Sequence, residues 1–297
     1  MRSQVRRWER HRRRDVDLSC PRRADGWGHR GIFQQGFIRV PTAADAEEKL
    51  KTLAIVQACH VALPNRDRVG RKLAGKTVLE WVVRRTSDCQ RLDGILVLVG
   101  DTPAEQELCQ QLPPDVQLVV GPEPDALSRF AAVVARHQAE AVVRVCADNP
   151  FVDPVMIDRL VTTADSQPES DYISYCSSDG QPTILSSLGP FAEWCSSAAI
   201  ARADAEATRP VDRQGVTHYL HSHPQRFRVR LLRMPPRLDR SDVRLRIDGQ
   251  ENWEEIQVIY DALGPEEWDW NHLAGLLERQ PATRRRKPLH QPFETSH

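Results

Sequence analysis

From Thr52 onward, short apolar runs alternate with segments in which apolar residues recur at helical spacing. The short runs are nearly continuous in Val, Ile and Leu, which is typical of parallel strands covered by helices on both faces. This alternation predicts βα units on a mostly parallel sheet, and therefore a three-layer α/β fold. The predicted strands are Leu53–Ala58, Gly94–Gly100, Val116–Val120, Ala141–Val145, Asp171–Tyr175, Phe191–Cys195, Phe227–Leu232 and Val243–Ile247. The predicted helices are Thr77–Thr86, Pro103–Leu112, Asp125–His137, Pro154–Thr163, Ser197–Ala207, Arg213–His221, Asn252–Leu263 and Trp268–Leu277.

This pattern divides the chain into three parts. Residues 51–280 carry the alternation and are expected to form one domain, whereas residues 281–297 are polar and predict a loose tail. Residues 1–50 are rich in arginine and poor in apolar residues, which predicts a solvated extension without a function of its own. An arginine-rich nucleic-acid arm and a transit peptide are the alternatives, although Glu9, Asp15 and Asp17 weaken the second.

Composition narrows the classes of protein further. The 297 residues are 40% hydrophobic, and no apolar run approaches the roughly 18 residues that a membrane helix needs, so no membrane span is expected. Lys plus Arg equals Asp plus Glu at 41 each, so no overall field attracts nucleic acid, and a nucleic-acid partner is not expected. The seven cysteines are scattered and form no Cys-x-x-Cys pair, which favours a reduced, cytoplasmic protein.

Ligands of open parallel sheets bind beyond the carboxyl ends of the strands, so the residues directly after strands are the first candidates for a site. The loop Cys59–Lys72 follows the first predicted strand and is basic. Asp148 and Asp248 each end an apolar strand, where a carboxylate must meet water, a cation or hydrogen-bond donors. A Mg²⁺ ion, commonly held by one or two carboxylates and substrate phosphates, would satisfy both. The alternative is that both aspartates cap the helices that follow them.

The turn Gly121–Asp125 gives a weaker signal, because it leads into a helix whose N-terminus could receive an anion. An ordinary N-cap formed by Asp125 is the alternative, and the residues alone favour it.

Several segments along the chain together resemble the spore-coat-polysaccharide type of cytidylyltransferase, a family related to CMP-KDO and CMP-sialic acid synthetases. No single motif is decisive, but their order and spacing are collectively specific, and the resemblance runs from about Leu53 to Leu277. The segments that carry it are Leu53–Ala58, Leu73–Lys76 with Leu79-Glu80, Gly121–Phe130, Val142–Pro154, Val216–Leu220, His223–Phe227 and Leu245–Asp248.

The resemblance implies one nucleotidyltransferase domain with a Rossmann-like fold of the GT-A-like, nucleotide-diphospho-sugar transferase kind. It implies that a sugar hydroxyl attacks the α-phosphorus of CTP and releases pyrophosphate, with Mg²⁺ as cofactor and CTP and a sugar or sugar acid as partners; a homodimer is compatible with it. The implied catalytic residues are Arg68, Asp148 and Asp248, of which both aspartates hold the metal. The implied nucleotide-binding residues are Gln57, Ala58, Arg66, Asp125, Arg129 and Arg144, and the implied acceptor-binding residues are Glu193 and Arg213.

The chain departs from the family pattern in two places. In the first loop, Cys59 and Pro64 occupy two arginine positions, and Arg68 stands at the position of a lysine. In the acceptor half, Gly189–Glu193 lacks the family's aspartate, and Asp212–Thr217 lacks a glutamate and a histidine. Loss of a well-placed cation in phosphoryl transfer can cost about 10³-fold or more in rate.

These observations leave three hypotheses. The first is a divergent cytidylyltransferase-like enzyme of cell-surface polysaccharide biosynthesis, and the second is a catalytically inactive relative that binds a nucleotide, a sugar or a partner protein. The third is nucleic-acid binding through the N-terminal arginines, which would require steep salt dependence. A glycosyltransferase is a weaker rival, because Asp148-Asn149-Pro150 lacks the second carboxylate of an Asp-x-Asp metal motif.

Overall fold

The computed structural model describes residues 50–58, 69–100, 112, 116–121, 125–186, 188–240, 242–247, 250–264 and 269–279. The N-terminal extension, the C-terminal tail and nearly all of the predicted helix Pro103–Leu112 lie outside these residues, so those predictions stay predictions. Within the described part of the chain, no helix has the length and apolar character needed to span a membrane.

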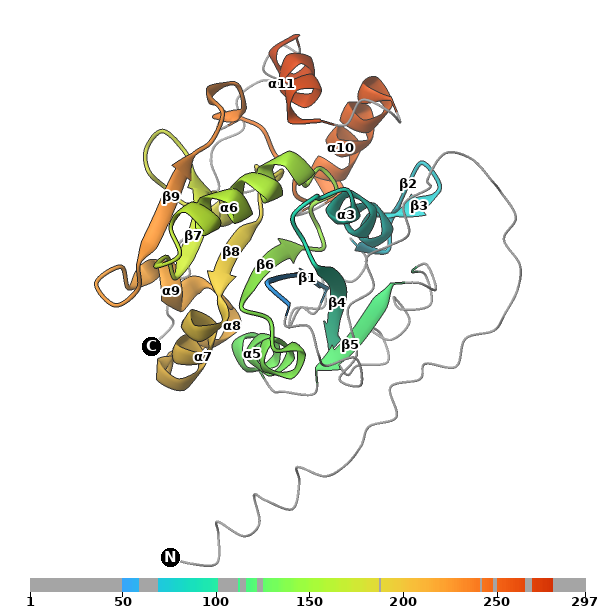
Figure 1. Cartoon of the computed structure of the whole chain (residues 1–297). Coiled ribbons are helices and arrows are strands. Elements are labelled where there is room, and N and C mark those ends of the chain that lie inside the picture. Colours follow the sequence, from blue (N-terminus) through green and yellow to red (C-terminus); the bar gives the residue numbers. More distant parts are fainter. Residues whose placement is uncertain are drawn as a thin grey trace, which may run out of the picture. The chain divides into compact units, whose positions relative to one another are not determined.

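Seven strands of the described chain form one mostly parallel sheet (Figure 1). Their order is β5-β4-β1-β6-β8-β7-β9, and only β8 runs antiparallel to its neighbours. β8 lies between β6 and β7, and β6 and β7 run in the same direction. The strands are β1 (Thr52–Gln57), β4 (Gly94–Gly100), β5 (Gln117–Gly121), β6 (Ala141–Cys146), β7 (Tyr172–Cys176), β8 (Glu193–Ser196) and β9 (Val229–Arg233). A separate hairpin pairs β2 (Lys72–Leu73) with β3 (Lys76–Thr77).

Two hydrophobic clusters cover opposite faces of the sheet, because successive strand side chains alternate between them. Val143 and Val145 of β6 belong to one cluster, and Val142 belongs to the other. The first cluster includes residues of α3 (Val78–Ser87), α6 (Pro154–Ser166), α10 (Gln250–Leu263) and α11 (Trp270–Arg279). The second includes residues of α5 (Ala126–His137), α7 (Ser197–Glu206) and α9 (His218–Ser222). The predicted three-layer α/β fold is confirmed.

Several helices begin where a polar side chain caps the first turn, α3, α5 and α6 among them. Thr77, Asp125 and Asp153 accept hydrogen bonds from the backbone N–H groups of Glu80, Ser128 and Met156, at 3.1, 2.9 and 3.0 Å. Each such cap stabilises a helix by about 1 kcal/mol. The N-cap alternative for Asp125 is therefore confirmed.

The predicted strand Val243–Ile247 is wrong, because this segment forms no strand although Leu245 and Ile247 are buried. The sheet explains this outcome. β6 is already paired on both sides, by β1 and β8, so its neighbourhood offers no free edge for another strand. The segment makes one backbone hydrogen bond beyond the end of β6, from Ile247 N to Asp148 O at 2.9 Å.

The single helix predicted over Arg213–His221 is also wrong. The structure has two short helices, α8 (Pro210–Gln214) and α9, separated by Gly215, Val216 and Thr217. Val216 has a φ of 39°, which lies in the left-handed region and cannot continue a helix. Two further short turns are 3₁₀-helices, η3 (Thr183–Leu185) and η4 (Pro236–Leu238).

Candidate active site at the carboxyl edge of the sheet

Buried polar side chains gather where the parallel strands β1 and β6 end. Gln57 closes β1, Arg144 lies near the end of β6, and Asp148 follows β6 in a turn. The exposed fractions of Gln57, Arg144 and Asp148 are only 3%, 9% and 3%. Because burial of polar groups is costly unless they are paired, their partners define what each can do.

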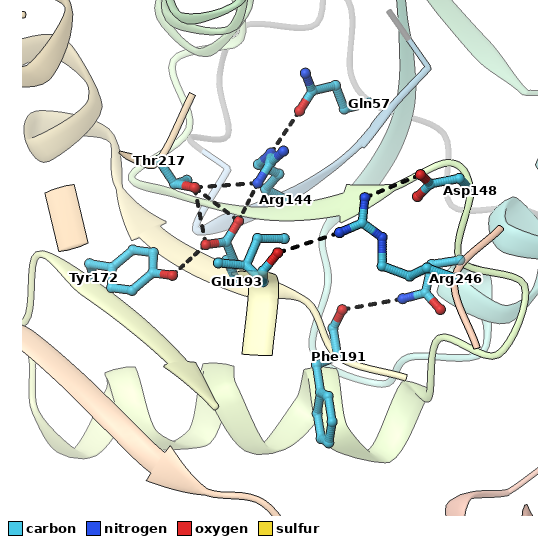
Figure 2. A network of polar contacts seen from close by, with 10 residues as sticks. Gln57, Arg144, Asp148, Tyr172, Phe191, Glu193, Thr217 and Arg246 are labelled. Atoms are coloured by element: carbon cyan, nitrogen blue, oxygen red, sulfur yellow. Dashed lines mark hydrogen bonds and ion pairs between the residues drawn. The ribbon is translucent and has the colours of Figure 1, made fainter. Parts of the chain in front are cut away.

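Arg144 lies at the centre of a buried network (Figure 2). Its Nε donates to Gln57 Oε1 at 2.7 Å, and its Nη1 donates to Glu193 on the neighbouring strand β8 and to Thr217 Oγ1 at 3.3 Å. Glu193 Oε1 also accepts hydrogen bonds from the Tyr172 hydroxyl and from the Thr217 hydroxyl, the second at 3.0 Å. The structure therefore joins Arg144, predicted on the nucleotide side, to Glu193, predicted on the acceptor side.

The charges of this network are fixed by its surroundings. Burial opposes the charge on Arg144, but Cys146 and the Glu193 carboxylate outweigh burial, so the pKa of Arg144 is raised above its usual value. Burial and the adjacent Glu193 raise the pKa of Tyr172, so its hydroxyl remains a donor. Arg144 is thus held as a cation in one orientation.

Two donors in the network have no partner among the described residues: Gln57 Nε2 and Arg144 Nη2. Neither nitrogen is buried away from solvent, in contrast to the unsatisfied atoms elsewhere in the chain. Since Arg144 Nε engages the carbonyl oxygen of Gln57, the amide group of Gln57 must present its N–H donors away from Arg144. The pair therefore offers hydrogen bonds to an acceptor-bearing ligand at the ends of β1 and β6.

Asp148 is paired with a cation that comes from far along the chain. Arg246 Nη2 donates to Asp148 Oδ2 at 3.1 Å, and Arg246 Nη1 lies 3.4 Å from the carbonyl oxygen of Ile184 (Figure 2). Burial opposes the charge on Arg246, but Cys146 and Asp148 outweigh it and raise its pKa. Asp148 caps no helix in the described structure, since Asp153 is the N-cap of α6.

The second carboxylate oxygen of Asp148 is the candidate ligand for the predicted metal ion. Asp148 Oδ1 is buried and has no hydrogen-bond partner, and the same is true of Asn149 Oδ1 beside it. An unpaired buried carboxylate oxygen fits a ligand to a hard divalent cation. Within the described ranges, no group of three or more His, Cys, Asp or Glu residues could hold a metal ion. A Mg²⁺ ion is commonly held by one or two carboxylates together with substrate phosphates.

The loop before β8 is anchored to the turn that carries Asp148. Asn149 Nδ2 donates to the carbonyl oxygens of Gly189 and Phe191, at 2.9 and 3.3 Å. Gly189 has a φ of 102°, and a Cβ at this position would lie 2.6 Å from Leu245 Cβ. Both observations require glycine here.

We expect Gly189→Ala to lower the free energy of unfolding by about 1–3 kcal/mol more than Gly180→Ala does, as judged by urea denaturation. The two glycines share a left-handed φ, but a Cβ at Gly180 would meet nothing within 4 Å. Gly180→Ala therefore measures backbone strain alone, and equal losses in the two variants would contradict the close approach of Leu245.

A second cluster holds Asp125 and Arg213. Arg213 Nη2 donates to Asp125 Oδ2 at 2.9 Å and to Asp204 Oδ1 at 2.8 Å, so it ties α8 to α5 and α7. Arg129 follows on the first turns of α5, and its N–H donates to Asp125 O at 3.1 Å. The hydrogen bonds of the Arg213 side chain therefore reach α5 and α7, away from the network of Arg144.

The remaining predicted residues are placed as follows. Ala58 lies directly after β1, and its N–H donates to Leu98 O at 2.9 Å. Arg66, Arg68 and Asp248 lie outside the described residues, as do Cys59 and Pro64. Ile247, which precedes Asp248 in the sequence, is hydrogen-bonded to the backbone of Asp148.

Three residues that contact the predicted site residues were not predicted from the sequence: Tyr172, Thr217 and Arg246. A signal existed for Arg246, because it is a lone cation between Leu245 and Ile247 directly before a predicted metal ligand. Thr217 lies in a segment that carried the resemblance, but its contact with Glu193 depends on the break between α8 and α9. No local signal marks Tyr172 among the apolar residues of β7.

An open, mostly parallel α/β sheet with carboxylate, amide and guanidinium groups beyond its carboxyl edge is the arrangement of nucleotide-binding proteins. The family model of the cytidylyltransferases matches residues 66–275. The chain therefore belongs to the cytidylyltransferase family, whose members are CTP-utilising nucleotidyltransferases.

Individual proteins are similar to this chain over most of its length. The uncharacterized protein MJ1063 of Methanocaldococcus jannaschii is 27% identical over 238 residues, which cover 78% of this chain and 92% of that protein. The spore coat polysaccharide biosynthesis protein SpsF of Bacillus subtilis is 26% identical over 236 residues, 77% of this chain and 95% of SpsF. The solved structure of a cytidylyltransferase from Leptospira borgpetersenii shares the fold, with a TM-score of 0.68, 16% identity, and coverage of 80% and 98%. The resemblance deduced from the motifs is confirmed.

Proposed function

We propose that this chain transfers CMP from CTP to a hydroxyl group of a sugar or sugar acid, with release of pyrophosphate, in the synthesis of a surface polysaccharide. The observation that carries the proposal is the convergence of Gln57, Arg144 and Asp148 at the carboxyl ends of β1 and β6. The match to cytidylyltransferases over residues 66–275 supports CTP as the nucleotide, and the similarity to SpsF supports the polysaccharide context.

On this proposal, the free donors of Gln57 and Arg144 bind the nucleotide, with the Ala58 segment beside them. Asp125 and Arg129, at the start of α5, support the wall of the nucleotide pocket. Arg66 and Arg68 supply positive charge to the triphosphate. These assignments follow the family motifs.

Glu193 acts on the acceptor site indirectly, by positioning Arg144, because its two carboxylate oxygens already accept hydrogen bonds from Arg144, Tyr172 and Thr217. Arg213 serves it by holding α8 against α5 and α7. Both residues thus position other groups.

Asp148, through its unpaired Oδ1, and Asp248 would hold Mg²⁺. The ion would neutralise charge that develops on the phosphates. The protein's own task in such a transfer is to align the acceptor oxygen with the α-phosphorus and to balance the phosphate charge with cationic side chains. The oxygen–phosphorus bond of the product forms as the bond to pyrophosphate breaks.

The test is pyrophosphate release from CTP and Mg²⁺ with a panel of neutral sugars and 3-deoxy-sugar acids. We expect release with at least one acceptor, and a product whose mass equals that of the acceptor plus CMP minus water. A related active cytidylyltransferase is the positive control. The absence of pyrophosphate release with every acceptor of the panel, while the positive control is active, would contradict the proposal.

An inactive relative that binds a nucleotide, a sugar or a partner protein is the second candidate, and Cys59 and Pro64 favour it because they replace family arginines. The double variant Cys59→Arg/Pro64→Arg separates the two candidates. Turnover that appears only in the variant would support the inactive relative, whereas equal turnover in both proteins would mean that the two positions are dispensable.

We place the protein in a reducing compartment such as the cytoplasm. Among the described residues, Cys89, Cys146, Cys176 and Cys195 are all buried and unpaired. A homodimer stays a prediction.

A further inference from the structure

The pair of Asp148 and Arg246 is joined by a single hydrogen bond of 3.1 Å. Three other pairs, Arg237–Glu278, Arg209–Asp212 and Arg240–Asp242, use two nitrogens and two oxygens, whereas Arg213–Asp125 and Arg144–Glu193 also share one hydrogen bond. Bidentate pairing is the stronger arrangement, so the pair of Asp148 and Arg246 lacks the geometry that would hold it most firmly.

Both partners keep an unsatisfied buried atom. Arg246 Nε and Asp148 Oδ1 are each shielded from solvent without a hydrogen-bond partner. An unsatisfied buried donor and acceptor are both costly. A pair built only for stability would join these two atoms, so the arrangement indicates that each group has another partner in a different state of the site.

The backbone beneath the pair is held independently of it. Ile247 N donates to Asp148 O at 2.9 Å, and the Asn252 side chain donates to Arg246 O. The two side chains can therefore separate while the backbone of both residues remains anchored.

We propose that Arg246 blocks Asp148 from binding a free divalent cation, and that Arg246 leaves Asp148 to bind the phosphates of an incoming nucleotide. The metal would then enter the site together with the nucleotide. The inference rests on the metal-binding role proposed above for Asp148. Arg246 occupies one carboxylate oxygen and places a positive charge beside the other, and both effects disfavour a lone cation. A triphosphate offers the guanidinium a partner of higher negative charge and brings oxygen ligands for the metal.

This role compensates for the changes in the first loop. Cys59 and Pro64 stand where the family has arginines, so the chain lacks two cations there. Arg246 supplies a cation from a different segment, next to Asp148. Arg246 is in this sense a phosphate-binding residue that also controls access to a metal ligand.

The experiment measures Mn²⁺ binding to the full chain by the electron paramagnetic resonance signal of the free ion, with and without a non-hydrolysable α,β-methylene analogue of CTP. The Mn²⁺ that the analogue binds in the absence of protein is measured separately and subtracted. For the wild type, we expect weak binding of Mn²⁺ alone and a gain of about tenfold or more with the analogue, a typical size for coupling between ligands. For Arg246→Met, we expect Mn²⁺ alone to bind about tenfold more tightly, with a smaller gain from the analogue.

Arg230→Met removes the same charge from an exposed position on β9, three strands across the sheet from β6, and should behave as the wild type. If Arg246→Met does not fold, as judged by its circular dichroism melt, Arg246→Gln replaces it, since glutamine keeps a donor without the charge. Mn²⁺ binding that is equal in the wild type and the Arg246 variant would overturn the proposal, as would wild-type binding that the analogue leaves unchanged. Because this readout needs no turnover, absence of pyrophosphate release would overturn the proposed function and leave the role of Arg246 standing.

Discussion

Replacing Glu193 with alanine is expected to lower the free energy of unfolding by about 3–5 kcal/mol, because Arg144 would remain as a buried cation without its partner. Glu193 is 1% exposed and accepts hydrogen bonds from Arg144, Tyr172 and Thr217, so the substitution removes an acceptor from three donors at once. Urea denaturation followed by circular dichroism measures the loss.

The exposed pair of Arg237 and Glu278 provides the control, because it has good geometry without burial. Glu278→Ala should leave the unfolding midpoint nearly unchanged, since solvent screens exposed ion pairs. An equally small effect of Glu193→Ala would contradict the buried network and return Glu193 to direct contact with the acceptor.

Replacing Asp148 with asparagine is expected to reduce the rate of pyrophosphate release by about 10³-fold, because the site loses the carboxylate charge that would hold the Mg²⁺ ion, and with it the cation that would balance the phosphate charge. Asparagine has nearly the same shape and keeps an oxygen that can accept from Arg246, so the fold should survive. The rate is measured at saturating CTP and Mg²⁺ with the best acceptor of the panel.

Asp242→Asn is the matched control, since Asp242 is also paired with an arginine, Arg240, but lies at the surface. It should release pyrophosphate at the wild-type rate. An Asp148→Asn variant as active as this control would remove Asp148 from the chemistry.

Most of the sheet could be predicted because its strands are local signals. Runs such as Gly94–Gly100 and Ala141–Val145 are buried along their whole length. Their continuous apolar sequence predicts this burial on both faces of the sheet. The direction of β8 could not be predicted. A strand of four residues, Glu193–Ser196, carries no local mark of whether it pairs parallel or antiparallel.

The two wrong predictions, a strand over Val243–Ile247 and a single helix over Arg213–His221, were wrong because of contacts distant in the sequence. Val243–Ile247 has the composition of a strand, but β6 had no free edge left to pair with it. The segment Arg213–His221 has helical spacing, but Val216 adopts a left-handed φ, and Thr217 between the two helices is bonded to Glu193. In both segments tertiary contacts outweigh local preference.

The placement of Asp148 at the carboxyl edge of the sheet was predictable from topology, because Asp148 follows a buried parallel strand. Its environment was not. Arg246 is 98 positions away from Asp148 along the chain, and Glu193 is 49 positions from Arg144. Pairings across such separations come only from the assembled sheet, so sequence spacing could indicate that Asp148 lies at the sheet edge but not which arginine pairs with it.

The account depends on CTP and a divalent cation binding together at the carboxyl ends of β1 and β6. A structure of the chain crystallised with CTP and Mg²⁺ tests this most directly. The account predicts the nucleotide beside Gln57 and Arg144, with a cation about 2.1 Å from an oxygen of Asp148. Nucleotide bound elsewhere, or Asp148 still paired with Arg246 and without a cation, would contradict it.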